Sequence, residues 1–139
     1  MLYFIKKYPF SITLVLTVLY LSFAKPPQVE IMYFPYMDKV VHFCMYAGIS
    51  GVLWLEFFLN YRKCEILPVR HALIGAVLCP IIFGGLIEIG QHYLTSYRGG
   101  EWLDLLANTT GVIAGSLVSW IFVRKLFRRK ERAGGKRHR

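Results

Sequence analysis

Four long apolar stretches divide the chain, at residues 8–24, 40–60, 72–94 and 103–123. Each has close to the ~17 to 25 residues that an α-helix needs to cross the hydrocarbon core of a bilayer. Short segments with charges, proline or glycine separate them. The pattern predicts an all-α membrane protein, with a bundle of four transmembrane helices in residues 1–123 and a basic, disordered tail at residues 124–139.

Polar and small positions recur at helical spacing in the fourth stretch. The steps are four, three and four residues, so these positions share one face of a helix. They are Asp104, Asn108, Gly111 and Gly115. Because the two glycines form a GxxxG pair, we expect this face to pack closely against another helix.

The second and third stretches also carry polar groups. Asp38 and His42 are four residues apart at the start of the second stretch and share a face. Glu88 lies six residues before the end of the third, about 9 Å along the axis, and so below the headgroups. Pro80 predicts a kink, because its ring clashes with the carbonyl four residues earlier. Glu56 is expected to snorkel or to pair with Arg62 or Lys63.

Composition agrees with a membrane protein, because 55% of the 139 residues are hydrophobic and a soluble domain has about 45 to 50%. The net charge of +9 could suggest nucleic acid, but the basic residues alternate between connections. They cluster before the first stretch, between the second and third, and after the fourth. This positive-inside pattern predicts that both termini are cytoplasmic, and it argues against a nucleic-acid partner.

The first stretch has a second interpretation. It follows Lys6 and Lys7 and ends in small residues before Lys25, as a cleavable signal peptide does. Its length also fits a retained membrane anchor. The three cysteines are widely spaced, so they predict neither a disulfide framework nor a CxxC metal site.

With this topology, polar groups from three segments converge at the outer face. They are Asp38, Lys39, His42, Glu88, Gln91, Arg98, Asp104 and Asn108. Charged groups inside a bilayer usually face an interior, a partner or water. Three uses are chemically possible: binding of an anion by Arg98 and Lys39, ligation of a divalent metal, or proton transfer by a buried carboxylate. The same residues could instead form a network that only joins the helices.

The metal interpretation depends on two pairs at i, i+4 spacing, Asp38 with His42 and Glu88 with His92, together with Asp104. For catalysis, the candidates are Glu88 or Asp104 as a base and His42 as its partner. No nucleophile motif such as GxSxG is present. The sequence predicts no cofactor and no resident metal.

The order of these motifs resembles the VanZ-like family of small bacterial membrane proteins. It runs DKVVHF, then GGLIEIGQ, then an arginine in the turn, then DLLANTTGVIAG. The resemblance extends from about residue 8 to 123 and covers the eight polar residues above with Gly111 and Gly115. His92 lies outside the pattern, which weakens the metal interpretation. The resemblance implies a protein of the bacterial inner membrane and cell envelope, with relatives linked to low-level resistance to teicoplanin-type glycopeptide antibiotics.

Three hypotheses follow. The first is a protein whose outer cluster binds a polar or anionic ligand, lipid-linked or from the cell wall. The second is an intramembrane hydrolase or transferase acting on a lipid-linked precursor. The third, a transporter, would require a homo-oligomer, which the GxxxG stripe would permit. In every case membrane lipids are partners.

Overall fold

In the computed structural model, residues 6–24, 36–61, 68–95 and 101–135 are described, with side chains as far as residue 125. All regular elements in these residues are helices. They are α2 (Pro9–Phe23), α3 (Met37–Tyr61), a continuous stretch of α4 (Val69–Leu73), the π-helical turn η2 (Ile74–Leu78) and α5 (Cys79–Leu94), and finally α6 (Trp102–Gly135). The predicted all-α bundle of four helical segments is confirmed.

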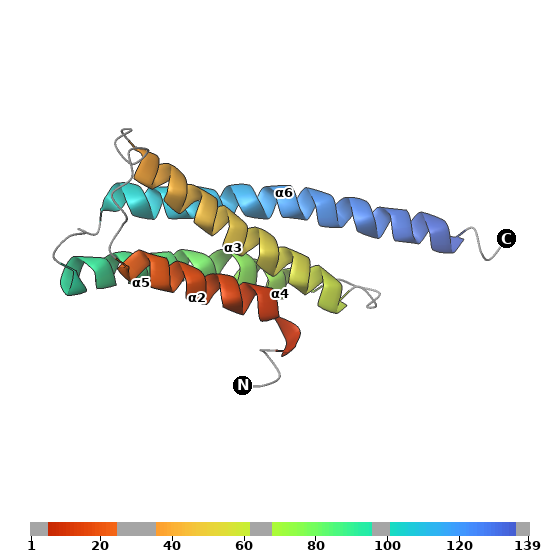
Figure 1. Cartoon of the computed structure of the whole chain (residues 1–139). Coiled ribbons are helices and arrows are strands. Elements are labelled where there is room, and N and C mark those ends of the chain that lie inside the picture. The colour runs from red at the N-terminus through yellow and green to blue at the C-terminus, as the bar shows by residue number, and fades with distance from the viewer. Residues whose placement is uncertain (1–5, 25–35, 62–67, 96–100, 136–139) are drawn as a thin grey trace.

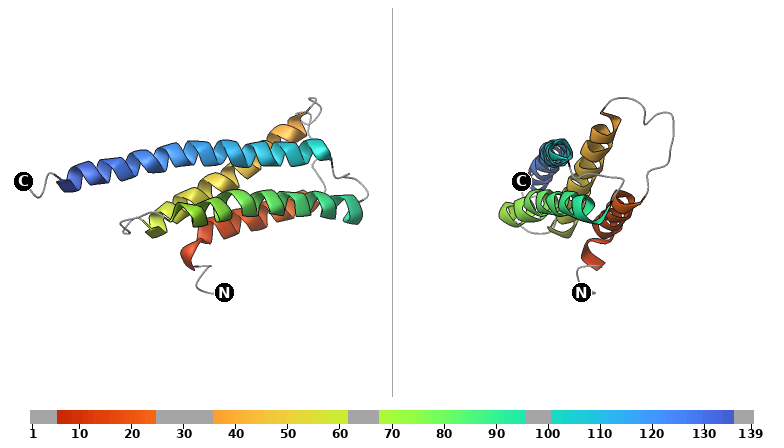
Figure 2. Two further views of the ribbon diagram at one scale, coloured as in Figure 1. Left: turned by 180° about the vertical axis from the view of Figure 1, so that it is seen from behind. Right: turned by 90° about the vertical axis from the view of Figure 1, so that its left-hand side faces the viewer.

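Successive segments run in opposite directions, as Figures 1 and 2 show. The starts of α3 and α6 lie at one end of the bundle with the ends of α2 and α5. We call this the α6-start end. The opposite end carries the start of α2, the end of α3 and the start of α4, and α6 extends beyond it. The predicted polar groups are therefore brought to one end by alternating chain direction.

Three helical stretches are long and apolar enough to cross a membrane, at Met37–Tyr61, Val69–Leu94 and Trp102–Lys125. Large apolar side chains such as Leu86 and Leu117 point outward, where lipid would cover them. The chain is thus a multi-pass membrane protein. α2 is apolar but has only 15 residues. At 1.5 Å per residue it spans about 22 Å, less than the ~30 Å of a bilayer core.

The last helix is longer than the sequence indicated. A disordered tail was predicted after residue 123, but α6 continues as a helix to Gly135. That prediction is wrong as far as Gly135. The extension is rich in Arg and Lys, which have high helix propensity, and it ends at a pair of glycines.

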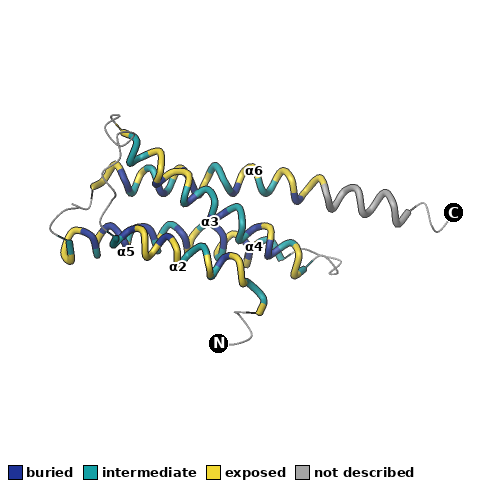
Figure 3. Tube along the Cα trace, viewed as in Figure 1, coloured by how far each residue is buried: buried dark blue, intermediate teal, exposed yellow. Residues whose placement is uncertain are grey.

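Buried residues occur along the length of the bundle (Figure 3). Two clusters form the core. The first contains Val18, Tyr46, Ile49, Ile87 and Val112. The second, nearer the opposite end, contains Trp54, Phe57, Ala72 and Ala76. Because Val18 comes from α2, the short first helix belongs to the packed core.

α3 and α6 form the most extensive helix contact. At its centre, a Cβ atom on Gly111 would overlap the backbone carbonyl of Phe43, and one on Gly115 would overlap that of Ala47. The GxxxG pair therefore packs against α3 within the same chain. This face is not available to a second copy, so the stripe gives no support to an oligomer.

A kink was predicted at Pro80, and the structure has the π-helical turn η2 just before this proline. Proline has no N–H to donate to the carbonyl of Ala76. The hydroxyl of Ser50 donates to that carbonyl instead, at 2.8 Å. Ser50 also hydrogen-bonds the hydroxyl of Ser116, at 2.6 Å. A pair of serines on α3 and α6 thus satisfies a backbone acceptor on the neighbouring segment.

Glu56 is only 4% exposed, so its side chain does not snorkel. Its carboxylate accepts the backbone N–H groups of Phe10 and Ser11, at 2.8 and 3.0 Å, and the Ser11 hydroxyl. The first N–H groups of a helix have no intrahelical acceptor. Glu56 of α3 therefore caps the start of α2, a long-range contact that the sequence analysis missed.

We expect Gly115→Ala to lower the melting temperature of the purified protein, because the added methyl would push α6 away from the backbone of Ala47. Overpacking of this kind costs about 1 to 3 kcal/mol. Gly51→Ala is the matched control in the same interface, since its Cβ would lie 3.6 Å from Ser119 Oγ, an ordinary contact. Thermal scans in detergent that gave both variants equal melting temperatures would contradict the close packing.

Candidate functional site

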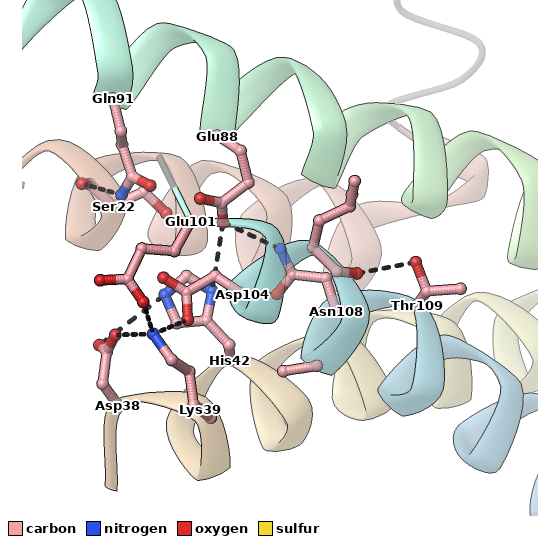
Figure 4. Close-up of polar contacts among 12 residues, drawn as sticks. Ser22, Asp38, Lys39, His42, Glu88, Gln91, Glu101, Asp104, Asn108 and Thr109 are labelled. Carbon is pink, nitrogen blue, oxygen red and sulfur yellow. Dashed lines mark hydrogen bonds and ion pairs between the residues drawn. The ribbon is translucent and has the colours of Figure 1, made fainter. Parts of the chain in front are cut away.

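A cluster of polar side chains lies at the α6-start end, where α3, α5 and α6 meet (Figure 4). α3 contributes Asp38, Lys39 and His42, α5 contributes Glu88, and α6 contributes Asp104 and Asn108, with Glu101 just before it. Helical spacing accounts for the convergence, because each helix presents residues three or four apart on one face. We call this set the polar cluster.

Lys39 is at the centre of the charged part of the cluster. Its Nζ lies 2.5 Å from Asp104 Oδ1, 2.6 Å from Glu101 Oε2 and 3.4 Å from Asp38 Oδ2. The Asp104 side chain is 7% exposed, whereas those of Asp38 and Glu101 are 41% and 58% exposed. Lys39 therefore neutralises a buried carboxylate on α6 and holds the starts of α3 and α6 together.

A second link, made of hydrogen bonds, runs deeper. His42 Nδ1 lies 3.0 Å from Asn108 Oδ1, and Asn108 Nδ2 donates to Glu88 Oε1 at 3.2 Å. All three residues are buried. Since the Asn108 amide group donates to Glu88, its oxygen is the acceptor and His42 Nδ1 carries a proton. His42 Nε2 faces Asp38 Oδ1 at 3.9 Å, too far for a hydrogen bond.

Glu88 connects the polar cluster to a cavity of about 350 Å³ between α5 and the start of α6. Glu88 Oε2 has no hydrogen-bond partner among the described residues. The cavity wall also carries Glu101 and the rings of His92, Tyr93 and Trp102. A buried carboxylate oxygen normally has a partner. Glu88 is therefore, with Glu101, a candidate acceptor for a ligand in the cavity.

The carboxylates and His42 also form a possible metal group. One ligand atom from each of Asp38, His42 and Asp104 lies within 4.8 Å of the others. The Lys39 ammonium, however, contacts both of these carboxylates and already supplies a positive charge between them. A metal ion would have to displace it. His92 is not part of this group, so the Glu88/His92 pair proposed from the sequence is not assembled as a metal site.

One predicted site residue, Gln91, is placed elsewhere. Gln91 is buried and donates from Nε2 to the backbone oxygen of Ser22 at 2.7 Å. It thus joins α5 to the last turn of α2, where carbonyl groups lack intrahelical donors. Arg98 lies outside the described residues. The structure brings together the other six: Asp38, Lys39, His42, Glu88, Asp104 and Asn108.

The sequence analysis missed Glu101, Tyr93 and Trp102 as residues of the site. Glu101 is three residues before Asp104, so the stripe on α6 could have been extended to it. Tyr93 and Trp102 resembled ordinary interfacial aromatic residues, and nothing in their spacing distinguishes a cavity wall from a membrane belt.

Comparison with known proteins adds to this geometry. A family model described as VanZ/LLP1 matches residues 1–123. The chain belongs to the VanZ/LLP1 family. The match includes α2, α3, the α4–α5 stretch and α6 as far as residue 123, and it confirms the resemblance drawn from the polar motifs. No curated protein and no solved structure matches the chain.

For this member of the VanZ/LLP1 family, we expect Lys39→Met to destabilise the bundle strongly. The substitution leaves the buried Asp104 carboxylate beside two other acids without its cation, and breaking a buried pair costs about 3 to 5 kcal/mol. The double variant Lys39→Met, Asp104→Asn should recover part of the lost stability. The control is Lys125→Met on an exposed part of α6. Melting curves in which Lys39→Met matched this control would contradict the central role of Lys39.

Proposed function

We propose that this protein of the bacterial inner membrane binds the polar part of a lipid-linked or cell-wall molecule in the cavity between α5 and α6. By binding it, the protein would alter sensitivity to glycopeptides of the teicoplanin type. The single observation that carries the proposal is Glu88, which lines that cavity together with Glu101 and whose buried Oε2 has no side-chain hydrogen-bond partner among the described residues.

The chemistry of the cavity wall favours a ligand rich in hydrogen-bond donors. Carboxylate oxygens accept from hydroxyl, amine and amide groups, and exposed rings such as Trp102 can stack on the apolar faces of a sugar or peptide unit. Lys39 was expected to contact an anion, but its ammonium is engaged by three carboxylates. Binding of an anionic group of the ligand would therefore depend on Arg98.

The charge distribution supports an outward-facing site. Described basic residues at the opposite end include Lys6, Lys7 and Arg70, and Arg124 and Lys125 follow where α6 leaves the bundle. By the positive-inside rule this end, with both termini, is cytoplasmic and the polar cluster is extracytoplasmic. A reporter fused within residues 62–69 that read as external would contradict this orientation.

A second candidate function is an intramembrane hydrolase or transferase acting on a lipid-linked envelope precursor. The observation that favours it is the contact of the Glu88 carboxylate with both the cavity and His42, whose Nδ1 is 3.7 Å from Glu88 Oε1. Glu88 would act as the general base that accepts the proton of an attacking water or hydroxyl group. The His42 ring beside it would respond electrostatically when the Glu88 carboxylate loses its negative charge.

The binding proposal predicts that Glu88→Gln and Tyr93→Leu, expressed in a bacterial strain lacking the gene, fail to restore the wild-type response to teicoplanin. Glu88→Gln exchanges an acceptor in the cavity for a donor, and Tyr93→Leu removes a ring from its wall. Tyr20→Leu is the control, because Tyr20 on α2 is exposed to a similar extent, 72% against 79%. Immunoblots must show equal amounts of protein. An unchanged response in every strain, including the deletion, would remove the resistance part of the proposal.

The enzymatic alternative predicts turnover of labelled envelope lipids by the purified protein, with loss of turnover in both Glu88→Gln and His42→Gln. General acid–base groups typically contribute about 100- to 10,000-fold in rate. The assay is run with and without divalent metals. If the folded protein gave no product under either condition, the enzymatic alternative would be rejected and only the binding function would remain.

A further inference from the structure

The wall of the cavity between α5 and the start of α6 combines acidic groups with exposed aromatic rings. Glu88 and Glu101 supply the carboxylates, and Tyr93 and Trp102 supply the rings. Among the described residues that line the cavity, only His92 can carry a positive charge. A hollow lined mainly by one sign of charge concentrates ions of the opposite sign. The described wall therefore attracts cations more strongly than neutral or anionic groups.

Both carboxylates keep acceptor capacity beyond their contacts within the protein. An ionised carboxylate offers about four acceptor sites. Glu88 Oε1 accepts from Asn108, and the buried Oε2 has no side-chain hydrogen-bond partner among the described residues. Glu101 Oε2 contacts Lys39 at 2.6 Å, yet the Glu101 side chain is 58% exposed and open to further donors. Since ionised carboxylates only accept hydrogen bonds, the group that pairs with them must be a donor.

The rings separate two kinds of donor, a neutral hydroxyl and a charged ammonium group. The face of an aromatic ring carries partial negative charge and attracts a cation within about 6 Å of its centre, most strongly in tryptophan. A hydroxyl group hydrogen-bonds the carboxylates but gains little from this attraction. Ile89 and Leu105 add apolar surface for the carbon atoms next to the charged group. Carboxylates and rings together thus favour an ammonium group over the hydroxyl of a sugar or of glycerol.

Building on the binding function proposed above, we propose that the part of the ligand in this cavity is a primary ammonium group. Glu88 and Glu101 accept its hydrogen bonds, and the rings of Tyr93 and Trp102 cover it. Its three N–H donors suit the carboxylate acceptors, and its charge offsets the acids of the polar cluster. Primary amines occur in the envelope on ethanolamine phospholipids and on cell-wall peptides that contain a diamino acid.

The test measures binding to the full-length protein by native mass spectrometry. The probes are phosphatidylethanolamine and a soluble cell-wall peptide with a free side-chain amine, each compared with its N-acetylated form, and phosphatidylglycerol as a lipid without an amine. We expect at least one amine to bind. Acetylation, which removes the positive charge, should weaken its binding about tenfold. Binding of the lipid alone would identify a membrane lipid as the source of the amine, and binding of the peptide alone would identify the cell wall.

Variants connect this preference to the cavity wall. Glu101→Gln should reduce the preference for the amine over its acetylated form to about twofold or less, whereas a merely structural effect would weaken both forms equally. Trp102→Leu should weaken binding of the amine about threefold. Tyr20→Leu is the control, because it removes an exposed ring of α2 that is not on the wall, and it should leave binding unchanged.

Three outcomes would overturn the proposal. Equal binding of the amine and acetylated forms would reject the ammonium group while leaving the binding function in place. If folded protein bound none of the probes, phosphatidylglycerol included, the binding function would lose its support as well. Binding of the amine by an Arg98→Gln variant but not by the wild type would show that Arg98 itself is the cation that pairs with these carboxylates.

Discussion

The bundle depends on polar contacts between neighbouring helices, because a charged or hydrogen-bonding side chain left without a partner inside a bilayer is costly. Lipid chains are as apolar as leucine, so the hydrophobic effect does little to draw membrane helices together. Polar contacts join the segments pairwise instead. Lys39 joins α3 to the start of α6, His42 reaches α5 through Asn108, Gln91 holds α2, and Glu56 caps α2 from the other end. The short first helix is fixed at both of its ends in this way.

Close packing and polar contacts reinforce each other on α6. Gly111 and Gly115 bring the α6 backbone against α3. Asn108 and Asp104 lie on the same face of α6, about one and two turns before Gly111. A helix held this close places short side chains within hydrogen-bond distance of the partner helix, so little conformational freedom is lost when they pair. Pro80 acts comparably on the other neighbour, because it has no N–H for the Ala76 carbonyl, which accepts from Ser50 instead. The polar cluster is thereby preorganised before any ligand arrives.

Much of this arrangement could be predicted from the sequence, and the exceptions have physical causes. The lengths of the apolar stretches predicted the helical segments, and the periodicity of polar and small residues predicted the stripe on α6. Both predictions succeed because each depends on a single helix. Glu56 was missed, since capping depends on where a second helix begins in space. The ion pair between Lys39 and Glu101 was missed for a similar reason, because Glu101 precedes the first residue of α6. The end of α6 was misplaced because the apolar pattern stops at residue 123, whereas helix propensity continues through the basic residues.

The balance of charge in the polar cluster limits what can enter it. Four carboxylates, those of Asp38, Glu88, Glu101 and Asp104, face Lys39 and His42. Even with His42 protonated the described groups leave two negative charges in excess, at the edge of a medium of low dielectric constant where an unbalanced charge is costly. The excess must be offset by protons, by Arg98 or by donors of a ligand. An anionic ligand would add to the excess, whereas hydroxyl and ammonium groups would reduce it. The charge balance of the cluster therefore favours a donor-rich ligand over an anionic one for the binding function proposed for the cavity between α5 and α6.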